Sequence, residues 1–227
     1  MTFRKLFFLI LIGDLIAQNF REAYPIGEYM FKPALMISLA VYFYIVIKER
    51  LVTTERKWRD KQDKFILMAL IFSCLGDIAL MFADGFLPGL GSFLIAHLFY
   101  IFAFLQDNHG FIFSKKDRMH WGVLVLLFGI GLMGYLLPHL GEMQIPVGVY
   151  STTILVMLLT ALNRWKSVLS LSFQWVLSGA VLFVLSDSII AISRFVAPFS
   201  LSGIWIMVTY AIGQYLIVMG YLHKKEI

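Results

Sequence analysis

The sequence predicts an all-α polytopic membrane protein, a bundle of about eight transmembrane helices that form a single domain over residues 1–227. Three observations predict this class: the hydrophobic content, the spacing of long apolar segments, and the alternation of positive charge between loops. Of the 227 residues, 60% are hydrophobic and 15% are charged, whereas a soluble domain carries about 25% charged residues. A water-soluble fold of this size cannot bury so much apolar surface, so the excess is expected to face lipid.

The apolar segments that define the helices are separated by clusters of charged and turn residues. A helix that spans a bilayer needs about 20 mostly apolar residues, with about 17 to 25 tolerated. The first segment begins in a basic stretch at Arg4 and Lys5, and the second begins at Pro33. In chain order, the predicted helices cover residues 5–20, 33–47, 64–83, 90–106, 120–138, 147–163, 173–193 and 203–222.

The positions of the prolines support this segmentation. Proline in a helix interior removes a backbone hydrogen bond and clashes with the preceding turn. Each proline is predicted to lie at or between the apolar segments, and none in the middle of a helix: Pro25, Pro33, Pro88, Pro138, Pro146 and Pro198.

The positive charges alternate between successive loops. Sixteen of the 19 Lys and Arg residues fall on one side of the predicted bundle, and the other side receives Arg21, Lys32 and Arg194. Because cytoplasmic loops carry an excess of Lys and Arg, both termini are predicted to be cytoplasmic, in the inner (plasma) membrane of a bacterium. The same distribution explains the net charge of +5 as a topology signal and argues against nucleic acid as a partner.

Two features leave alternatives open. The N-terminal stretch MTFRKLFFLILIGDLIAQ is also compatible with a cleaved signal peptide, although Asp14 interrupts its apolar part. A short internal sequence similarity, between LGD at 75–77 and LSD at 185–187, is compatible with two parallel four-helix halves. This arrangement is known in transporters. Chance similarity between apolar helices explains the match between these two tripeptides equally well.

Few other motifs occur. The single cysteine, Cys74, excludes an internal disulfide. The sequence contains no Cys/His metal spacing, no glycine-rich phosphate loop and no GxSxG motif. Function is therefore sought among the polar side chains of the helices.

Ionisable side chains within the predicted helices are the candidates for a functional site. Such a side chain at the bilayer centre costs about 2.5–3.5 kcal/mol on insertion scales, so it usually faces the bundle interior. The aspartates Asp14, Asp77 and Asp187 lie well past the middle of helices that run outward. Helices that run inward carry polar residues in their first halves: Lys32, His97, Tyr210 and Gln214. This shared depth predicts one polar cavity, open to the non-cytoplasmic side.

Asp77 and Asp187 are the predicted catalytic pair. Gly76 and Ser73 leave room beside Asp77 for close packing or a ligand, and Ser186 places a hydroxyl next to Asp187. Two neighbouring carboxyl groups away from water favour one neutral acid beside one ionised base, the combination that acid-catalysed hydrolysis uses.

A structural role is the alternative for each candidate. The two aspartates are also compatible with hydrogen bonds to Gln214, Tyr210 or Lys32 that only hold helices together. His97 is compatible with a bond to a backbone carbonyl, and Lys32 with a side chain that extends to the interface.

Five strings in order along the chain resemble the YhhN family, also called the lysoplasmalogenase family. They are FKPAL from Phe31, LGDIALMF from Leu75, GLGSFLIAHLFYIFAF from Gly89, SGAVLFVLSD from Ser178 and YAIGQYLIVMG from Tyr210. Tyr150 and Met157 also fit the family pattern. Gly213 departs from it, since the family usually has alanine there, and residues 5–20 carry no matching motif.

The resemblance implies an eight-helix hydrolase that cleaves the vinyl-ether bond of lysoplasmalogen into a fatty aldehyde and a glycerophospho-base. It implies Asp77 and Asp187 as the catalytic residues, a lysophospholipid substrate among membrane lipids, and no metal or organic cofactor. No oligomeric state is implied. We expect substrate-binding or supporting roles for the remaining candidates: Lys32, His97, Tyr100, Tyr150, Ser186, Tyr210, Gln214 and Asp14.

A small proton-coupled or lipid transporter is the alternative function. It would use the same intramembrane carboxylates and parallel halves. A carrier needs access from both sides of the membrane, whereas the polar residues here are predicted to cluster in one half. The pattern therefore favours the hydrolase.

Overall fold

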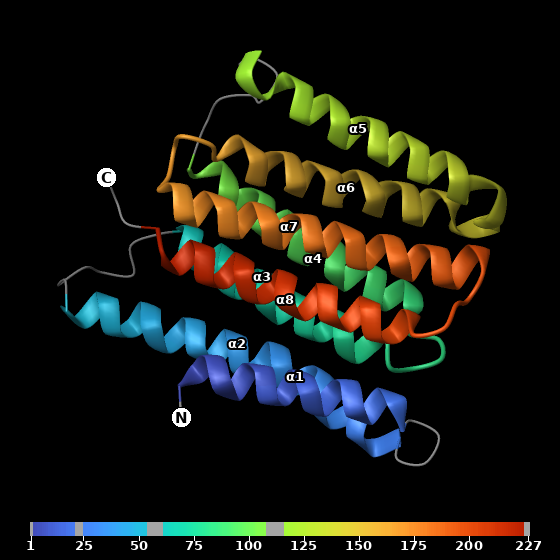
Figure 1. Cartoon of the computed structure of the whole chain (residues 1–227), viewed down its shortest axis with the longest axis horizontal. Coiled ribbons are helices and arrows are strands. Elements are labelled where there is room, and N and C mark those ends of the chain that lie inside the picture. Colours follow the sequence, from blue (N-terminus) through green and yellow to red (C-terminus); the bar gives the residue numbers. More distant parts are fainter. Residues whose placement is uncertain (1, 21–24, 54–60, 108–115, 225–227) are drawn as a thin grey trace. The chain divides into compact units, whose positions relative to one another are not determined.

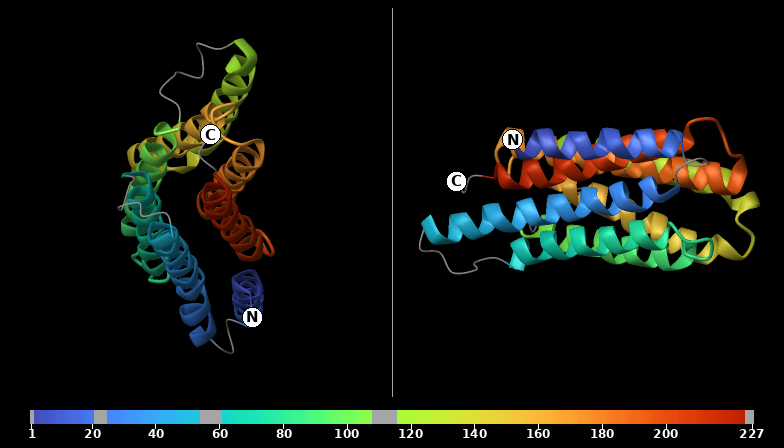
Figure 2. Two further views of the ribbon diagram at one scale, coloured as in Figure 1. Left: turned by 90° about the vertical axis from the view of Figure 1, so that its left-hand side faces the viewer. Right: turned by 90° about the horizontal axis from the view of Figure 1, so that it is seen from below.

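The computed structural model describes residues 2–20, 25–53, 61–107 and 116–224. Within these ranges the regular structure is helical and no strand occurs (Figure 1), which confirms the all-α class. The two turned views of Figure 2 show the same helices end-on and from below. The long helices are α1 (Phe3–Asn19), α2 (Pro25–Thr53), α3 (Lys61–Ala79), α4 (Phe86–Leu105), α5 (Lys116–Leu136), α6 (Gln144–Asn163), α7 (Ser170–Ala191) and α8 (Ser202–Leu222).

Three short helical segments complete the described structure. The 3₁₀ turns η2 (Leu137–His139) and η3 (Gly141–Met143) connect α5 to α6. A π-helical segment, η4 (Ile192–Val196), continues α7.

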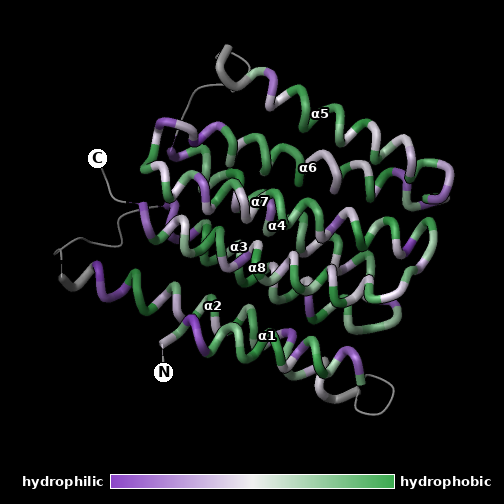
Figure 3. The backbone as a smooth tube through the Cα atoms, viewed as in Figure 1, coloured by the Kyte–Doolittle hydropathy of each residue, from purple (hydrophilic) through white to green (hydrophobic). Residues whose placement is uncertain are grey.

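Six segments among the described residues are long and apolar enough to cross a membrane: Tyr29–Arg50, Phe86–Leu105, Met119–His139, Gly141–Asn163, Ser170–Val196 and Ser202–Leu222. Figure 3 shows hydrophobic residues along most of their length. This confirms a polytopic membrane protein. Of the other two long helices, α1 has only 17 residues, and α3 carries Lys61, Asp63, Lys64 and Asp77. Eight crossings therefore stay a prediction.

The chain divides into two compact units, Met1–Ala103 and Phe104–Ile227. In the first unit, α2 packs against both α1 and α3. Helices α3 and α4 meet through aromatic rings, with the Phe65 and Phe102 centroids 5.7 Å apart and Phe72 and Phe99 at the same separation. The Gln62 amide also donates a 2.7 Å hydrogen bond to the Ala103 carbonyl.

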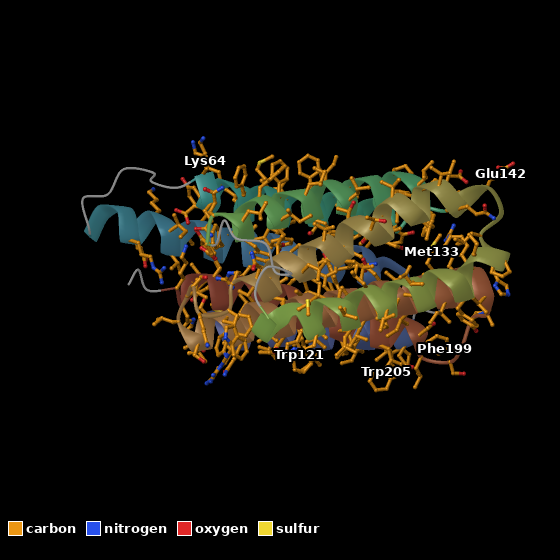
Figure 4. All side chains as sticks on the ribbon, turned by 90° about the horizontal axis from the view of Figure 1, so that it is seen from above. Lys64, Trp121, Met133, Glu142, Phe199 and Trp205 are labelled. Carbon is orange, nitrogen blue, oxygen red and sulfur yellow. The ribbon has the colours of Figure 1, made fainter. Side chains whose placement is uncertain are left out.

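In the second unit, α7 and α8 lie side by side (Figures 1 and 2) and form its most extensive helix contact. Glycines make this approach possible, because a Cβ built on Gly179 would lie 2.6 Å from the Gly213 carbonyl oxygen. Helix α6 packs against α7 and α5. Trp121 of α5 and Trp205 of α8 project outward (Figure 4), and both are exposed, as expected of side chains that contact lipid or its interface.

We expect Gly179→Ala to destabilise the protein by about 1–3 kcal/mol, the usual cost of overpacking. The new methyl would press on backbone atoms, Gly213 O at 2.6 Å and Ile217 N at 2.9 Å, which cannot rotate away. The matched control is Gly134→Ala on α5, where a Cβ meets nothing within 4 Å and helix propensity favours alanine. Thermal unfolding in detergent should show a lower midpoint for Gly179→Ala only, and equal midpoints would contradict this account of the contact.

The start of α2 differs from the prediction. The helix begins at Pro25, not at residue 33, and Pro33 lies inside it. Pro33 removes a single backbone hydrogen bond, and membrane helices tolerate this because neighbouring groups compensate. Pro88 and Pro146 instead lie in the first turns of α4 and α6, where the backbone N–H has no helical partner.

Helix bounds also revise the predicted depths. Because α4 begins at Phe86, His97 lies just past its middle, and Gln214 lies just past the middle of α8. The expectation that both lie in first halves is wrong for these two residues. Six of the charges that predict the orientation lie outside the described residues: Arg21, Arg56, Lys57, Arg59, Lys115 and Lys225.

Candidate active site

Asp187 lies near the end of α7 and is bound from α6. The hydroxyl of Tyr150 donates a hydrogen bond to Asp187 Oδ2. Tyr150 is buried, whereas Asp187 is partly exposed. A phenol has one polar atom on a rigid ring, so a buried tyrosine normally directs its hydroxyl to a specific partner. Here that partner is a predicted catalytic carboxyl group.

The backbone around Asp187 is fixed by α8. The Ser186 hydroxyl donates a 3.0 Å hydrogen bond to the Ile206 carbonyl. Ser186 therefore connects α7 to the backbone of α8. One turn before Asp187, the Phe183 ring meets Tyr210 of α8 edge-on, with centroids 5.3 Å apart. The side chain of Asp187 is therefore bound by α6, and the residues just before it, Phe183 and Ser186, contact α8.

Asp77 lies near the end of α3, and its side chain is buried, at 2% exposure. The residue before it lets α4 come close, since a Cβ on Gly76 would lie 2.7 Å from the Phe93 ring. The sequence left close packing or a ligand open at Gly76, and the structure shows close packing.

Residues 93, 97 and 100 of α4 share one helix face because of their spacing. Phe93 makes the contact with α3, and His97 and Tyr100 are fully buried on the same face. This places an imidazole and a phenol on the same buried face of α4 as Phe93.

Asp14 on α1 is also buried, and the Gln18 amide donates a 2.7 Å hydrogen bond to its Oδ2. The neighbouring Gly13 allows close approach of α2, because a Cβ there would lie 2.7 Å from the Phe31 ring. Lys32, next to Phe31, is partly buried near the start of α2. Gln18 is a partner that the sequence reading did not single out, although its spacing of four residues from Asp14 is the usual one for a helical pair.

Tyr210 and Gln214 lie one turn apart on α8, and both are buried. Between them, Gly213 faces α7, where a Cβ would lie 3.0 Å from the Gly179 carbonyl oxygen. The departure from alanine at this position thus fits a helix contact with little room for a methyl group.

A second buried polar group was missed by the sequence reading. The Arg164 guanidinium binds Asp107 through Nε, with 2.6 Å between Nε and Oδ2, and reaches the Ser172 hydroxyl at 3.2 Å. Lys224 pairs with the other Asp107 oxygen. The sequence analysis counted Arg164 and Lys224 only as positive charges in loops. Both lie far from Asp107 in the sequence, so no local pattern predicts that they contact it.

The structure thus joins Tyr150 to Asp187 and Tyr210 to the turn before Asp187. Asp77 and Asp187 belong to different units, and their pairing stays a prediction. Among the residues described, no group of three His, Cys, Asp or Glu side chains is arranged to hold a metal ion.

Fold and site together define a class, the polytopic α-helical membrane proteins that carry carboxyl side chains within their helices. The chain belongs to the YhhN family, whose model matches residues 27–221. Of the site residues predicted from the sequence, only Asp14 lies outside this range.

Named relatives extend across bacteria and mammals. The chain is 32% identical over 206 residues to a lysoplasmalogenase of Mycobacterium bovis, with 88% of the chain and 74% of the relative covered. It is 32% identical over 157 residues to the human lysoplasmalogenase TMEM86B, covering 69% of the chain and 62% of the relative. A bovine relative, lysoplasmalogenase TMEM86A, is 29% identical over 173 residues, with 71% of the chain and 66% of the relative covered. The chain thus spans less than two thirds of the two mammalian relatives. No solved structure matches the chain significantly.

Proposed function

We propose that this protein is a membrane-embedded lysoplasmalogenase, a hydrolase of the vinyl-ether bond of lysoplasmalogen. The observation that carries this proposal is the similarity to lysoplasmalogenases over 88% of the chain. The carboxyl side chains within its apolar helices supply the type of group that the reaction requires. The transporter alternative gains no support from the relatives.

The chemistry explains the need for carboxyl groups. Hydrolysis of a vinyl ether begins with proton transfer to the β-carbon, which leaves an oxocarbenium ion. Water then adds to the α-carbon, and the hemiacetal collapses to an aldehyde and the glycerol hydroxyl. One neutral acid and one carboxylate serve this sequence, as two carboxyl groups do in glycoside hydrolysis. We assign these two roles to Asp77 and Asp187.

The other site residues are proposed to bind or orient. His97, Tyr100, Tyr210 and Gln214 are buried polar side chains that are suited to orient water and substrate. Lys32, partly buried near the start of α2, would hold the substrate phosphate as a point charge. Ser186 supports the α7–α8 contact beside Asp187, and Asp14 with Gln18 would form the polar part of α1.

For topology we propose eight crossings of the inner (plasma) membrane with both termini in the cytoplasm. The alternation of Lys and Arg supports this orientation. Reporter fusions at each loop test it directly: a cytoplasmic reporter should be active at the two termini and silent at the loop around Pro198.

Aldehyde release from lysoplasmalogen by the detergent-purified protein is the experiment that tests the function. We expect a fatty aldehyde and a glycerophospho-base in equal amounts. The matched control is the saturated alkyl-ether lysolipid, which has no double bond to protonate and should stay intact. No aldehyde from the vinyl ether, or equal cleavage of both lipids, would refute the proposal.

A further inference from the structure

The hydrogen bond between Tyr150 and Asp187 distinguishes the two predicted catalytic residues. It connects α6 to α7, and its donor is the phenol hydroxyl of Tyr150 while its acceptor is Asp187 Oδ2. A phenol has a single proton to donate, and a hydrogen bond to an ionised acceptor is about twice as strong as one between neutral groups. A donated hydrogen bond therefore stabilises the ionised form of Asp187 more than its neutral form.

The backbone on both sides of Asp187 carries further hydrogen bonds, which support a positioning role. Tyr150 is buried between helices, and Ser186 anchors the backbone of α7 to Ile206 at 3.0 Å. Ser188 on the other side binds the Val184 carbonyl at 2.7 Å within α7. A carboxylate held by its own side-chain bond on such a support keeps one orientation, which is how catalytic groups are preorganised.

We propose that Tyr150 is a positioning residue that holds Asp187 as the ionised carboxylate of the reaction, which makes Asp77 the acid. This inference rests on the proposed function. Asp187 is then the group that stabilises the oxocarbenium ion and accepts a proton from water, and Tyr150 acts only through Asp187.

The assignment gives a balanced sequence. The Asp77 proton forms a C–H bond with the β-carbon, using the electron pair of the double bond. The oxygen of water bonds to the α-carbon while Asp187 takes a water proton. The hemiacetal hydroxyl then returns its proton to Asp77, the bond from the α-carbon to the glycerol oxygen breaks, and that oxygen receives the proton from Asp187. Both aspartates end in their starting states, with one water consumed.

Tyr150→Phe tests the role in turnover, because it keeps the ring and removes the hydroxyl. We expect kcat to fall about 10- to 100-fold, as for loss of a hydrogen bond to a charged group, with KM within about 2-fold. Tyr135→Phe on α5 is the matched control, since Tyr135 is 53% exposed, and it should retain full activity. A wild-type kcat in Tyr150→Phe, or a loss confined to KM, would overturn the positioning role.

Infrared difference spectroscopy tests the charge assignment without turnover. The wild type minus Asp187→Asn spectrum should show a carboxylate band and no protonated carboxyl band, whereas wild type minus Asp77→Asn should show the protonated band. The reverse pattern would overturn the assignment even if Tyr150→Phe fails to fold. Because this readout needs no substrate, it separates failure of the inference from failure of the proposed hydrolase function.

Discussion

Asp187→Asn and Asp77→Asn are each expected to lower the rate of aldehyde release by about 10²- to 10⁴-fold, the range that general acid or base groups contribute. Asparagine has nearly the same shape as aspartate, and at position 187 its side-chain oxygen can still accept the hydrogen bond from Tyr150. It can neither donate an acidic proton nor carry a negative charge. The loss should therefore appear in kcat, measured with detergent-solubilised protein at saturating lysoplasmalogen.

The control is Asp84→Asn, which changes an exposed aspartate between α3 and α4 and should leave kcat unchanged. Thermal midpoints of all three variants should stay close to that of the wild type, so that a loss of rate is not a loss of fold. Full activity in both Asp77→Asn and Asp187→Asn would remove the acid–base mechanism. Full activity in one alone would leave a single catalytic carboxyl group.

The helices were predictable because lipid imposes a simple rule. Backbone N–H and C=O groups must be paired within the segment, so a long apolar stretch has to be a helix. The start of α2 was not predictable in the same way. Pro33 was read as a boundary because proline removes a backbone hydrogen bond inside a helix, while the helix continues back to Pro25.

The site was predictable only in part. Asp77 and Asp187 stand out because an ionisable group is costly in an apolar segment, and a single sequence is enough to find them. The partner of Asp187 is a tyrosine 37 positions earlier, and aromatic residues are common in membrane helices. Only the resemblance to a family singled out Tyr150, since no spacing rule connects residues on two different helices.

The Arg164 group shows a further limit of sequence reading. In a count of charges by loop, Arg164 and Lys224 are two of many cations near the predicted cytoplasmic surface. In the structure both contact Asp107, and Arg164 also has its guanidinium carbon 5.5 Å from the centre of the Phe104 ring. Acidic residues contribute little to the orientation signal, so Asp107 had no weight in that reading.

We expect Arg164→Ala to destabilise the protein by about 3–5 kcal/mol, the usual effect of removing one partner of a buried ion pair. The Arg164 and Asp107 side chains are both 0% exposed, so water cannot replace the lost guanidinium. The variant also removes the contact with Ser172 at the start of α7. Thermal unfolding in detergent should show the lower midpoint.

Lys224→Ala is the matched control for Arg164→Ala, because both cations bind the same carboxylate. The Lys224 side chain is 24% exposed, so solvent reaches it, and an accessible ion pair contributes about 1 kcal/mol or less. Arg164→Lys separates charge from geometry, since lysine keeps the charge but cannot bind Asp107 and Ser172 as one planar fork. If Arg164→Ala and Lys224→Ala unfold at the same temperature, burial is not what gives the Asp107–Arg164 pair its strength. If only Arg164→Ala is destabilised, Arg164 holds the end of α6 and the start of α7 to Asp107, in the segment that follows α4.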